Sequence, residues 1–136
     1  MSMSDWNKQI IAEFRANGGK VAQFGDAPMV ILHTIGAKSG ELREIPLVAK
    51  VDHDSMIIFA SKAGATTNPD WYHNLVATPE IDVEFVAEKF RARLDQLSAE
   101  DAGSAIQAQA ELMPAFGEYV KSAAPRQIPA FAIHRI

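Results

Sequence analysis

Cysteine is absent from the 136 residues, which excludes disulfides, thiolate metal sites and a cysteine nucleophile. Basic residues are not in excess either, because 13 Lys and Arg against 17 Asp and Glu give a formal net charge of −4. An acidic chain disfavours non-specific binding to nucleic acid, so we expect no nucleic-acid partner. No stretch approaches the roughly 18 apolar residues of a transmembrane helix, and residues 1–17 lack an apolar run of signal-peptide length. We expect a cytoplasmic protein.

Several catalytic motifs are also missing. The four histidines, His33, His53, His73 and His134, form no i, i+4 pair and no HExxH motif, so a metal site has little support and we expect none. No GxSxG elbow surrounds a serine, which argues against serine hydrolysis. What remains is typical of a protein that holds a cofactor, where the cofactor performs the difficult chemical step.

The composition is that of an ordinary globular protein, with 48% hydrophobic and 22% charged residues. The length suits one hydrophobic core, so we predict a single domain over residues 1–136. Trp6, Ile10, Ile11 and Phe14 recur at helical spacing, which predicts an N-terminal helix capped by Ser4 or Asp5 and ended by Gly18-Gly19. Its polar face is not basic, so packing on the domain is favoured over a membrane surface. Weak peripheral membrane contact stays open.

Six segments are rich in apolar and β-branched residues or alternate apolar with polar residues, as strands do. They are Pro28–Thr34, Ile45–Val51, Met56–Ser61, Ile81–Val86, Phe90–Leu97 and Ile128–Ile136. The third is nearly all apolar and is expected to be buried on both faces. Tight turns are predicted at residues 52–55 and at Glu88-Lys89.

Two further helices are predicted between these strands. Asn68 is placed to cap a short helix that has Pro69 at its first position and runs through Leu75. Ser98 is placed to cap a longer helix, whose body, residues 102–121, is broken at Pro114 or Gly117. This order of elements predicts an α+β fold with an antiparallel sheet or barrel.

The segment Gly36-Ala37-Lys38-Ser39-Gly40, followed by Arg43, is the first candidate site. Its glycines allow close approach of a ligand to the backbone, and Lys38, Ser39 and Arg43 offer charge and hydrogen-bond donors to a phosphate or carboxylate. It is not a P-loop, because the GxxxxGK[ST] spacing is missing. A solvated hairpin turn explains the same residues equally well.

Two later segments and one residue can each be interpreted either as part of a binding site or as ordinary structure. Ser61–Gly64 leaves the most apolar strand, which is typical either of a site mouth or of a strand exit. Residues 68–74 offer a helix N-terminus and aromatic rings to an anion and a planar ring, although Trp71 and Leu75 are favoured as core anchors. Tyr119 on the long helix is favoured as a core residue over a pocket residue.

Two sequence blocks resemble one known family. Residues 34–47, with Gly36, Lys38-Ser39-Gly40, Arg43 and Pro46-Leu47, resemble T-x-G-R-K-S-G-x-x-R-x-x-P-L, a signature of the deazaflavin (coenzyme F420)-dependent nitroreductase family. Residues 60–64 and 68–75 resemble its A-S-K-x-G and N-P-x-W-Y-x-N-L. Residues 13–19 and 126–129 are similar to family segments as well, so the resemblance covers nearly the whole chain.

The resemblance implies a split β-barrel of about six mostly antiparallel strands, related to FMN-binding proteins, and an oxidoreductase that uses coenzyme F420. Residues matching the family's cofactor positions are Gly36, Lys38, Ser39, Gly40, Arg43, Pro46, Ser61, Lys62, Ala63, Gly64, Asn68, Trp71, Tyr72 and Asn74. Lys38, Ser39 and Arg43 would hold the anionic phosphate and glutamate tail. Ser61–Gly64 would lie beside the deazaflavin ring, with Asn68, Trp71, Tyr72 and Asn74 forming the adjoining wall.

The expected reaction is hydride transfer from reduced F420 to a small organic acceptor, a quinone, nitroaromatic or activated alkene. Ser61 and Tyr119 are the expected donors to the acceptor's oxygen. Ala37 stands where the family has Arg, and Lys38 cannot copy a bidentate guanidinium. Two alternatives therefore stay open: an FMN-dependent oxidoreductase on the same barrel, and a non-catalytic protein that binds a deazaflavin or another anion. Monomer and homodimer are both compatible with the sequence.

Overall fold

The structure, a computed structural model, describes residues 3–25, 27–52 and 55–136. Six strands form a closed barrel in the order β1-β2-β3-β6-β5-β4, and every neighbouring pair is antiparallel. The strands are β1 (Met29–Ile35), β2 (Leu42–Asp52), β3 (Ser55–Phe59), β4 (Glu80–Phe85), β5 (Glu88–Gln96) and β6 (Ala130–Arg135). The predicted α+β barrel is therefore confirmed, while His53 and Asp54 of the predicted turn lie outside the described residues.

The barrel interior follows from the alternation of side chains along the strands. In β1, Val30 and Leu32 point into a cluster that also holds residues of the other five strands, whereas Met29 and Ile31 point outward. Helix α2 (Asp70–Ala77) adds Trp71 and Leu75 to the interior cluster. The prediction that these two residues are core anchors is therefore confirmed.

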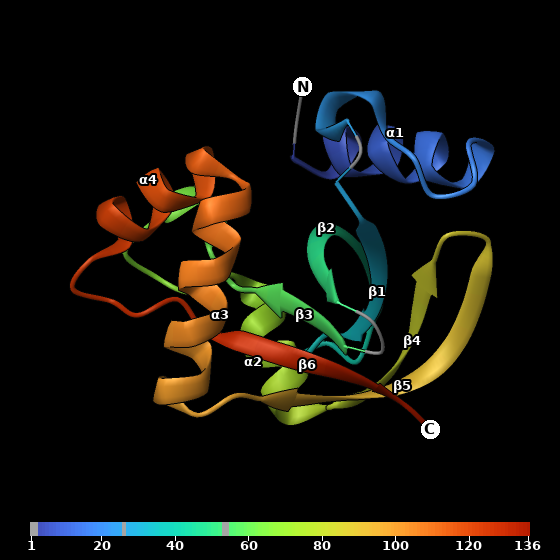
Figure 1. The fold of residues 1–136 in the computed structure, drawn as a ribbon. Helices are drawn as coiled ribbons and strands as arrows, with labels where there is room; N and C mark the ends of the chain where they lie inside the picture. Colours follow the sequence, from blue (N-terminus) through green and yellow to red (C-terminus); the bar gives the residue numbers. More distant parts are fainter. Residues whose placement is uncertain (1–2, 26, 53–54) are drawn as a thin grey trace.

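Helix α1 (Met3–Ala16) covers the outer side of β1 (Figure 1). Its apolar stripe of Ile10, Ile11 and Phe14 packs against Met29 and Ile31, so the prediction of packing on the domain is confirmed. The helix already includes residues 4 and 5, so capping by Ser4 or Asp5 was wrong. A 3-10 turn, η1 (Ala22–Phe24), follows, and the ring of Phe24 lies 6.4 Å from that of Trp6.

Helices α3 (Ala99–Leu112) and α4 (Pro114–Ala123) lie on another side of the barrel (Figure 1). The Ser98 side chain accepts a hydrogen bond from the Asp101 N–H, as predicted for the cap, and the chain breaks between the helices before Pro114. Gly117 lies within α4 and does not break it. Phe116 contacts Phe59 of β3 with ring centroids 5.0 Å apart, which attaches α4 to the barrel.

Two local predictions were wrong. The turn between β4 and β5 is formed by Val86 and Ala87 rather than by Glu88-Lys89, because β5 begins at Glu88. Strand β3 is buried only at Ile58 and Phe59, because its first residues lie at the turn end of the β2–β3 hairpin, where Ser55 pairs with Asp52. The loop after β3 contains a 3-10 helix, η2 (Lys62–Gly64). Among the described residues, no helix is long and apolar enough to cross a bilayer.

Candidate functional site

The loop between β1 and β2 is a compact turn with its charged side chains outside. The Gly36 N–H donates to the Glu41 carbonyl (2.8 Å), and the Gly40 N–H donates to the Gly36 carbonyl (2.9 Å). Gly40 has φ +71°, a conformation that favours glycine. Lys38, Ser39 and Arg43 are exposed. The fold thus presents Lys38 and Ser39 on this turn and Arg43 at the start of β2, directly after it.

Helix α2 holds this turn through Asn74. The buried Asn74 Oδ1 accepts a hydrogen bond from the Ala37 N–H at 2.9 Å. Asn74 was predicted as part of a cofactor wall, and the structure places it as a support for the turn that carries Lys38. About four residues of helix, roughly 6 Å, separate Asn74 from the start of α2. The N-terminal end of α2 leads directly into the second candidate segment, residues 60–68.

The backbone of residues 60–68 takes an unusual course. Lys62 has φ +49° and Gly64 has φ +81°, and Lys62 is the kind of residue that rarely adopts a left-handed conformation. The Lys62 Nζ lies 3.3 Å from Thr67 Oγ1. The side chain of Ala63 lies outside what the structure describes. Strained backbone of this kind clusters at functional sites, which makes the segment a stronger candidate than its sequence alone.

Helix α4 lies directly against η2 and brings Tyr119 to this segment. A Cβ built on Gly64 would lie 2.9 Å from Tyr119 Cα and 3.0 Å from Ser122 Cβ. Only a glycine therefore fits between η2 and α4. Tyr119 is 37% exposed, so the prediction of a core position was wrong, and its backbone lies beside Gly64.

The remaining predicted residues make contacts within the fold. Trp71 is buried, with its ring 6.3 Å from that of Phe131. Tyr72 packs on the same Phe131 at 5.8 Å, and its hydroxyl lies 3.5 Å from Gln96 Oε1. Pro46 is buried in β2 opposite Ile31 of β1. Contact of these residues with a coenzyme stays a prediction.

Arg126, in the connection between α4 and β6, binds the inner side of residues 60–68. Its Nε donates to the Ala65 carbonyl (3.2 Å), Nη1 to the Ala60 carbonyl (3.1 Å) and to Asn68 Oδ1 (2.7 Å), and Nη2 to the carbonyls of Ser61 (3.0 Å) and Ala65 (2.6 Å). Burial lowers its pKa. The prediction that Asn68 caps α2 was therefore wrong. Its side-chain oxygen accepts a hydrogen bond from Arg126, and Pro69 occupies the N-cap position.

The lysines and arginines divide into two groups by their partners. From residue 27 onward, and counting only described residues, most of them form ion pairs with Asp or Glu. The exceptions in this part of the chain are Lys38, Arg43, Lys62 and Arg126. All four belong to the two segments described above or contact them. In a chain of net charge −4, cations without acidic partners are suited to bind an anion.

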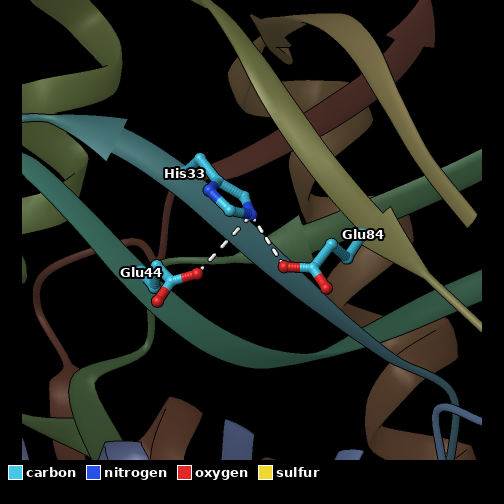
Figure 2. Close-up of side chains that lie close together, drawn as sticks. All are labelled: His33, Glu44 and Glu84. Carbon is cyan, nitrogen blue, oxygen red and sulfur yellow. Dashed lines mark hydrogen bonds and ion pairs between the residues drawn. The ribbon is translucent and has the colours of Figure 1, made fainter. Parts of the chain in front are cut away.

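A second cluster lies on the outer face of the barrel, and no sequence motif had indicated it. The His33 Nε2 lies 2.7 Å from Glu84 Oε2 and 3.8 Å from Glu44 Oε2 (Figure 2). These three ligand atoms lie within 4.8 Å of one another, close enough for a metal ion. Arg15 of α1, however, already contacts both carboxylates, that of Glu84 at 2.7 Å.

The guanidinium of Arg15 therefore occupies the place of a cation between Glu44 and Glu84. Its hydrogen bond holds the pKa of Glu84 below the ordinary value, against the opposing effect of burial. We interpret the cluster as an attachment of α1 to β1, β2 and β4. Arg15 is 29 residues from Glu44 and 69 from Glu84 in sequence, which is why local patterns did not indicate the cluster.

Comparison with known proteins finds a family that matches most of the chain. A profile of the F420H(2)-dependent quinone reductase family matches residues 6–134. An F420H(2)-dependent quinone reductase of Mycobacterium tuberculosis is 36% identical over 81 residues, which cover 58% of this chain and 54% of the relative. The chain thus spans about half the length of the curated relatives that it matches.

Two solved structures share the fold. An F420-H2 dependent reductase, FDR-A, superposes with a TM-score of 0.69 at 30% identity, covering 79% of this chain and 94% of the other. A protein described as a domain-swapped dimer gives a TM-score of 0.71 at 28% identity, covering 98% of this chain and all of the other. The split-barrel expectation is confirmed, and with a family match over nearly its whole length the chain belongs to the F420H(2)-dependent quinone reductase family.

Proposed function

We propose that this chain binds reduced coenzyme F420 and transfers its hydride to a quinone. The family membership supports the coenzyme and the class of acceptor. The observation in the structure that carries the proposal concerns three cations, Lys38, Arg43 and Lys62, on two segments connected by α2. From residue 27 onward, they are among the few lysines and arginines that have no acidic partner within the described part of the chain. A net-acidic protein would otherwise repel a polyanionic coenzyme.

The β1–β2 turn fits the anionic end of the coenzyme. Lys38 and Arg43 provide two exposed charges, and Ser39 adds a hydroxyl whose oxygen already accepts from the Glu41 N–H (3.1 Å), leaving its proton to donate. The Asn74–Ala37 hydrogen bond fixes the turn. In this proposal Lys38, Ser39 and Arg43 hold the phosphate and glutamate groups. Lys38 and Arg43 partly compensate for the arginine that the family has at the position of Ala37.

The segment of Ser61–Gly64 would bind the ring. When bound, reduced F420 supplies a hydride from its deazaflavin ring. The protein's task is to hold the acceptor close to the ring and to stabilise charge on the acceptor's oxygen. Ser61 and Tyr119 are the proposed hydrogen-bond donors, since α4 places Tyr119 against the strained turn of η2.

The first experiment is a fluorescence titration of the purified protein with F420, with FMN in parallel. We expect F420 to bind much more tightly than FMN. Replacing Lys38 and Arg43 together by Ala should weaken F420 binding about tenfold or more for each lost contact, because a charge-assisted hydrogen bond contributes about 1.5–3 kcal/mol. Lys89→Ala, which removes an exposed lysine paired with Asp82, is the matched control. Equal affinity of the double variant and the wild type would refute this role of the turn.

The acceptor is tested with menadione, a nitroaromatic compound and an activated alkene in the presence of reduced F420. We expect turnover with the quinone, and loss of turnover in Ser61→Ala and Tyr119→Phe. The presence of Ala37 in place of the family's arginine keeps a second candidate function open, that of a protein that binds the deazaflavin but reduces no acceptor. Tight F420 binding with no oxidation of reduced F420 by any acceptor would establish that alternative.

The assembly state is a separate part of the proposal. A relative of this chain is described as a domain-swapped dimer, and we propose that this chain also forms homodimers. Light scattering of the eluting protein should give twice the mass of 14.8 kDa. A single species at the monomer mass at micromolar concentration would reject the dimer.

A further inference from the structure

We propose that Arg126 is a positioning residue for the coenzyme. It holds residues 60–68 from behind in the one conformation that presents their backbone N–H groups to the ring. The inference rests on the proposed function in one respect, that the ligand in front of this segment is F420. The holding of the segment itself is independent of the ligand and can be measured without it.

The first argument is that the whole guanidinium is used on this segment. An arginine side chain has five N–H donors in a rigid fork, and Arg126 makes five hydrogen bonds to four oxygens, three of them carbonyls of Ala60, Ser61 and Ala65. Among the described residues no carboxylate pairs with it. A lysine ammonium, with three donors and no fork, cannot make the same set of contacts.

The second argument concerns the direction of the peptide groups. In a trans peptide the C=O and N–H point to opposite sides. The carbonyls of Ala60, Ser61 and Ala65 point at Arg126, so the N–H groups of the following residues, Ser61, Lys62 and Thr66, point away from it. Arg126 therefore fixes the direction of three backbone donors that it does not itself use, and in this proposal they serve carbonyl or phosphate oxygens of the ligand.

The third argument is the strain that lies between these anchor points. Lys62 and Gly64 both have positive φ, and the carbonyls that Arg126 binds, of Ser61 and Ala65, stand on either side of them. A strained backbone persists only where the surrounding contacts determine it from several directions. Helix α4 contacts Gly64 on one side. Arg126 constrains the same segment through its hydrogen bonds to the carbonyls of Ser61 and Ala65.

The fourth argument is electrostatic. The positive charge of Arg126 is half-buried, and its partners among the described residues are dipolar oxygens rather than carboxylates. Such a charge attracts a negative group or a carbonyl oxygen of a ligand that lies on the side of residues 60–68 away from Arg126. The same segment therefore gains donors and positive potential from one residue that need not touch the ligand.

The test compares Arg126→Lys with Arg93→Lys, an exposed arginine that pairs with Asp95. Without coenzyme, amide hydrogen exchange of residues 61–68 should accelerate about tenfold or more in Arg126→Lys and stay unchanged in the control. In the folded variant, well below its melting temperature, the Kd for F420 should rise about tenfold or more, since at least one charged hydrogen bond is lost. A role limited to holding the segment would change the exchange but leave the Kd for F420 unchanged in the folded protein.

Wild-type exchange and wild-type F420 affinity in Arg126→Lys would overturn the proposal. Should that variant not fold, Asn68→Ala removes one acceptor of Arg126 and should show the same two changes to a smaller degree; their absence would count equally against it. If the wild type does not bind F420, the proposed function fails, and faster exchange in Arg126→Lys would then support only the holding of the segment.

Discussion

Gly64 combines two constraints at one position: a left-handed backbone conformation and direct contact with α4. Its φ is +81°, and an added methyl group would meet Tyr119 Cα at 2.9 Å. Gly18 has a similar φ of +63°, but a methyl group added there would have no atom within 4 Å. The two glycines therefore separate the cost of the backbone conformation from the cost of the contact.

We predict that Gly64→Ala destabilises the protein by about 1–3 kcal/mol more than Gly18→Ala, because overpacking adds to a backbone cost that both share. In thermal unfolding this corresponds to a further drop of about 3–5 °C for each kcal/mol. It should also shift α4 and so reduce turnover through Tyr119. Equal melting temperatures of the two variants would mean that α4 is not held against η2 in solution.

Helix α1 is attached to the barrel in two ways. Its apolar stripe packs on Met29 and Ile31, and Arg15 at its C-terminal end binds Glu84 and Glu44. The first attachment was visible as a periodic pattern, whereas the second joins residues from three elements, α1, β2 and β4. Because Arg15 is about half exposed, its ion pairs should contribute only about 1 kcal/mol.

We predict that Glu84→Gln lowers stability by about 1 kcal/mol at pH 7, and that this difference vanishes in acid. The pKa of folded Glu84 is lowered, chiefly by Arg15. Its contribution is therefore complete above the unfolded pKa of 4.5 and is lost as the pH falls through the lower folded value. Urea unfolding of both proteins at several pH values below 5 measures it. The exposed Glu80→Gln is the control, and a difference that persists at pH 2 would contradict the assignment.

For the whole molecule, the distribution of charge matters more than its sum. The net charge of −4 opposes an anionic ligand at long range, while Lys38, Arg43 and Lys62 attract it locally. Exposed charges are screened by salt, and the Debye length falls from about 10 Å at 0.1 M to about 3 Å at 1 M. Local attraction dominates at contact distance, so binding should weaken with salt.

We predict that the Kd for F420 rises several-fold between low and 0.5 M salt, since the contacts of Lys38 and Arg43 are exposed. The slope should be smaller in the double Ala variant of these two residues. Fluorescence titrations at four salt concentrations measure both slopes. An affinity that does not respond to salt would mean that the exposed cations do not contact the coenzyme.

Much of the fold followed from local patterns. The α1 stripe, the six strands, the Ser98 cap and the break before Pro114 each depend on neighbours within a few residues, so periodicity and cap chemistry were sufficient. Two errors show the limit of such local patterns: the turn predicted at Glu88-Lys89, which lies at Val86-Ala87, and the helix cap predicted at Asn68. Asn68 has the right residue type for a cap, but an arginine 58 residues away binds its oxygen.

The sequence by itself determined the barrel class, the family motifs and the cation-bearing turn, because each is written in short runs of residues. Only the tertiary structure decided which polar atoms meet: Asn74 with Ala37, Arg126 with residues 60–68, and Arg15 with Glu84. It also decided that Tyr119 stands exposed against Gly64. The physical reason is that a partner for a polar or charged group depends on how distant segments pack, and packing is a property of the whole chain.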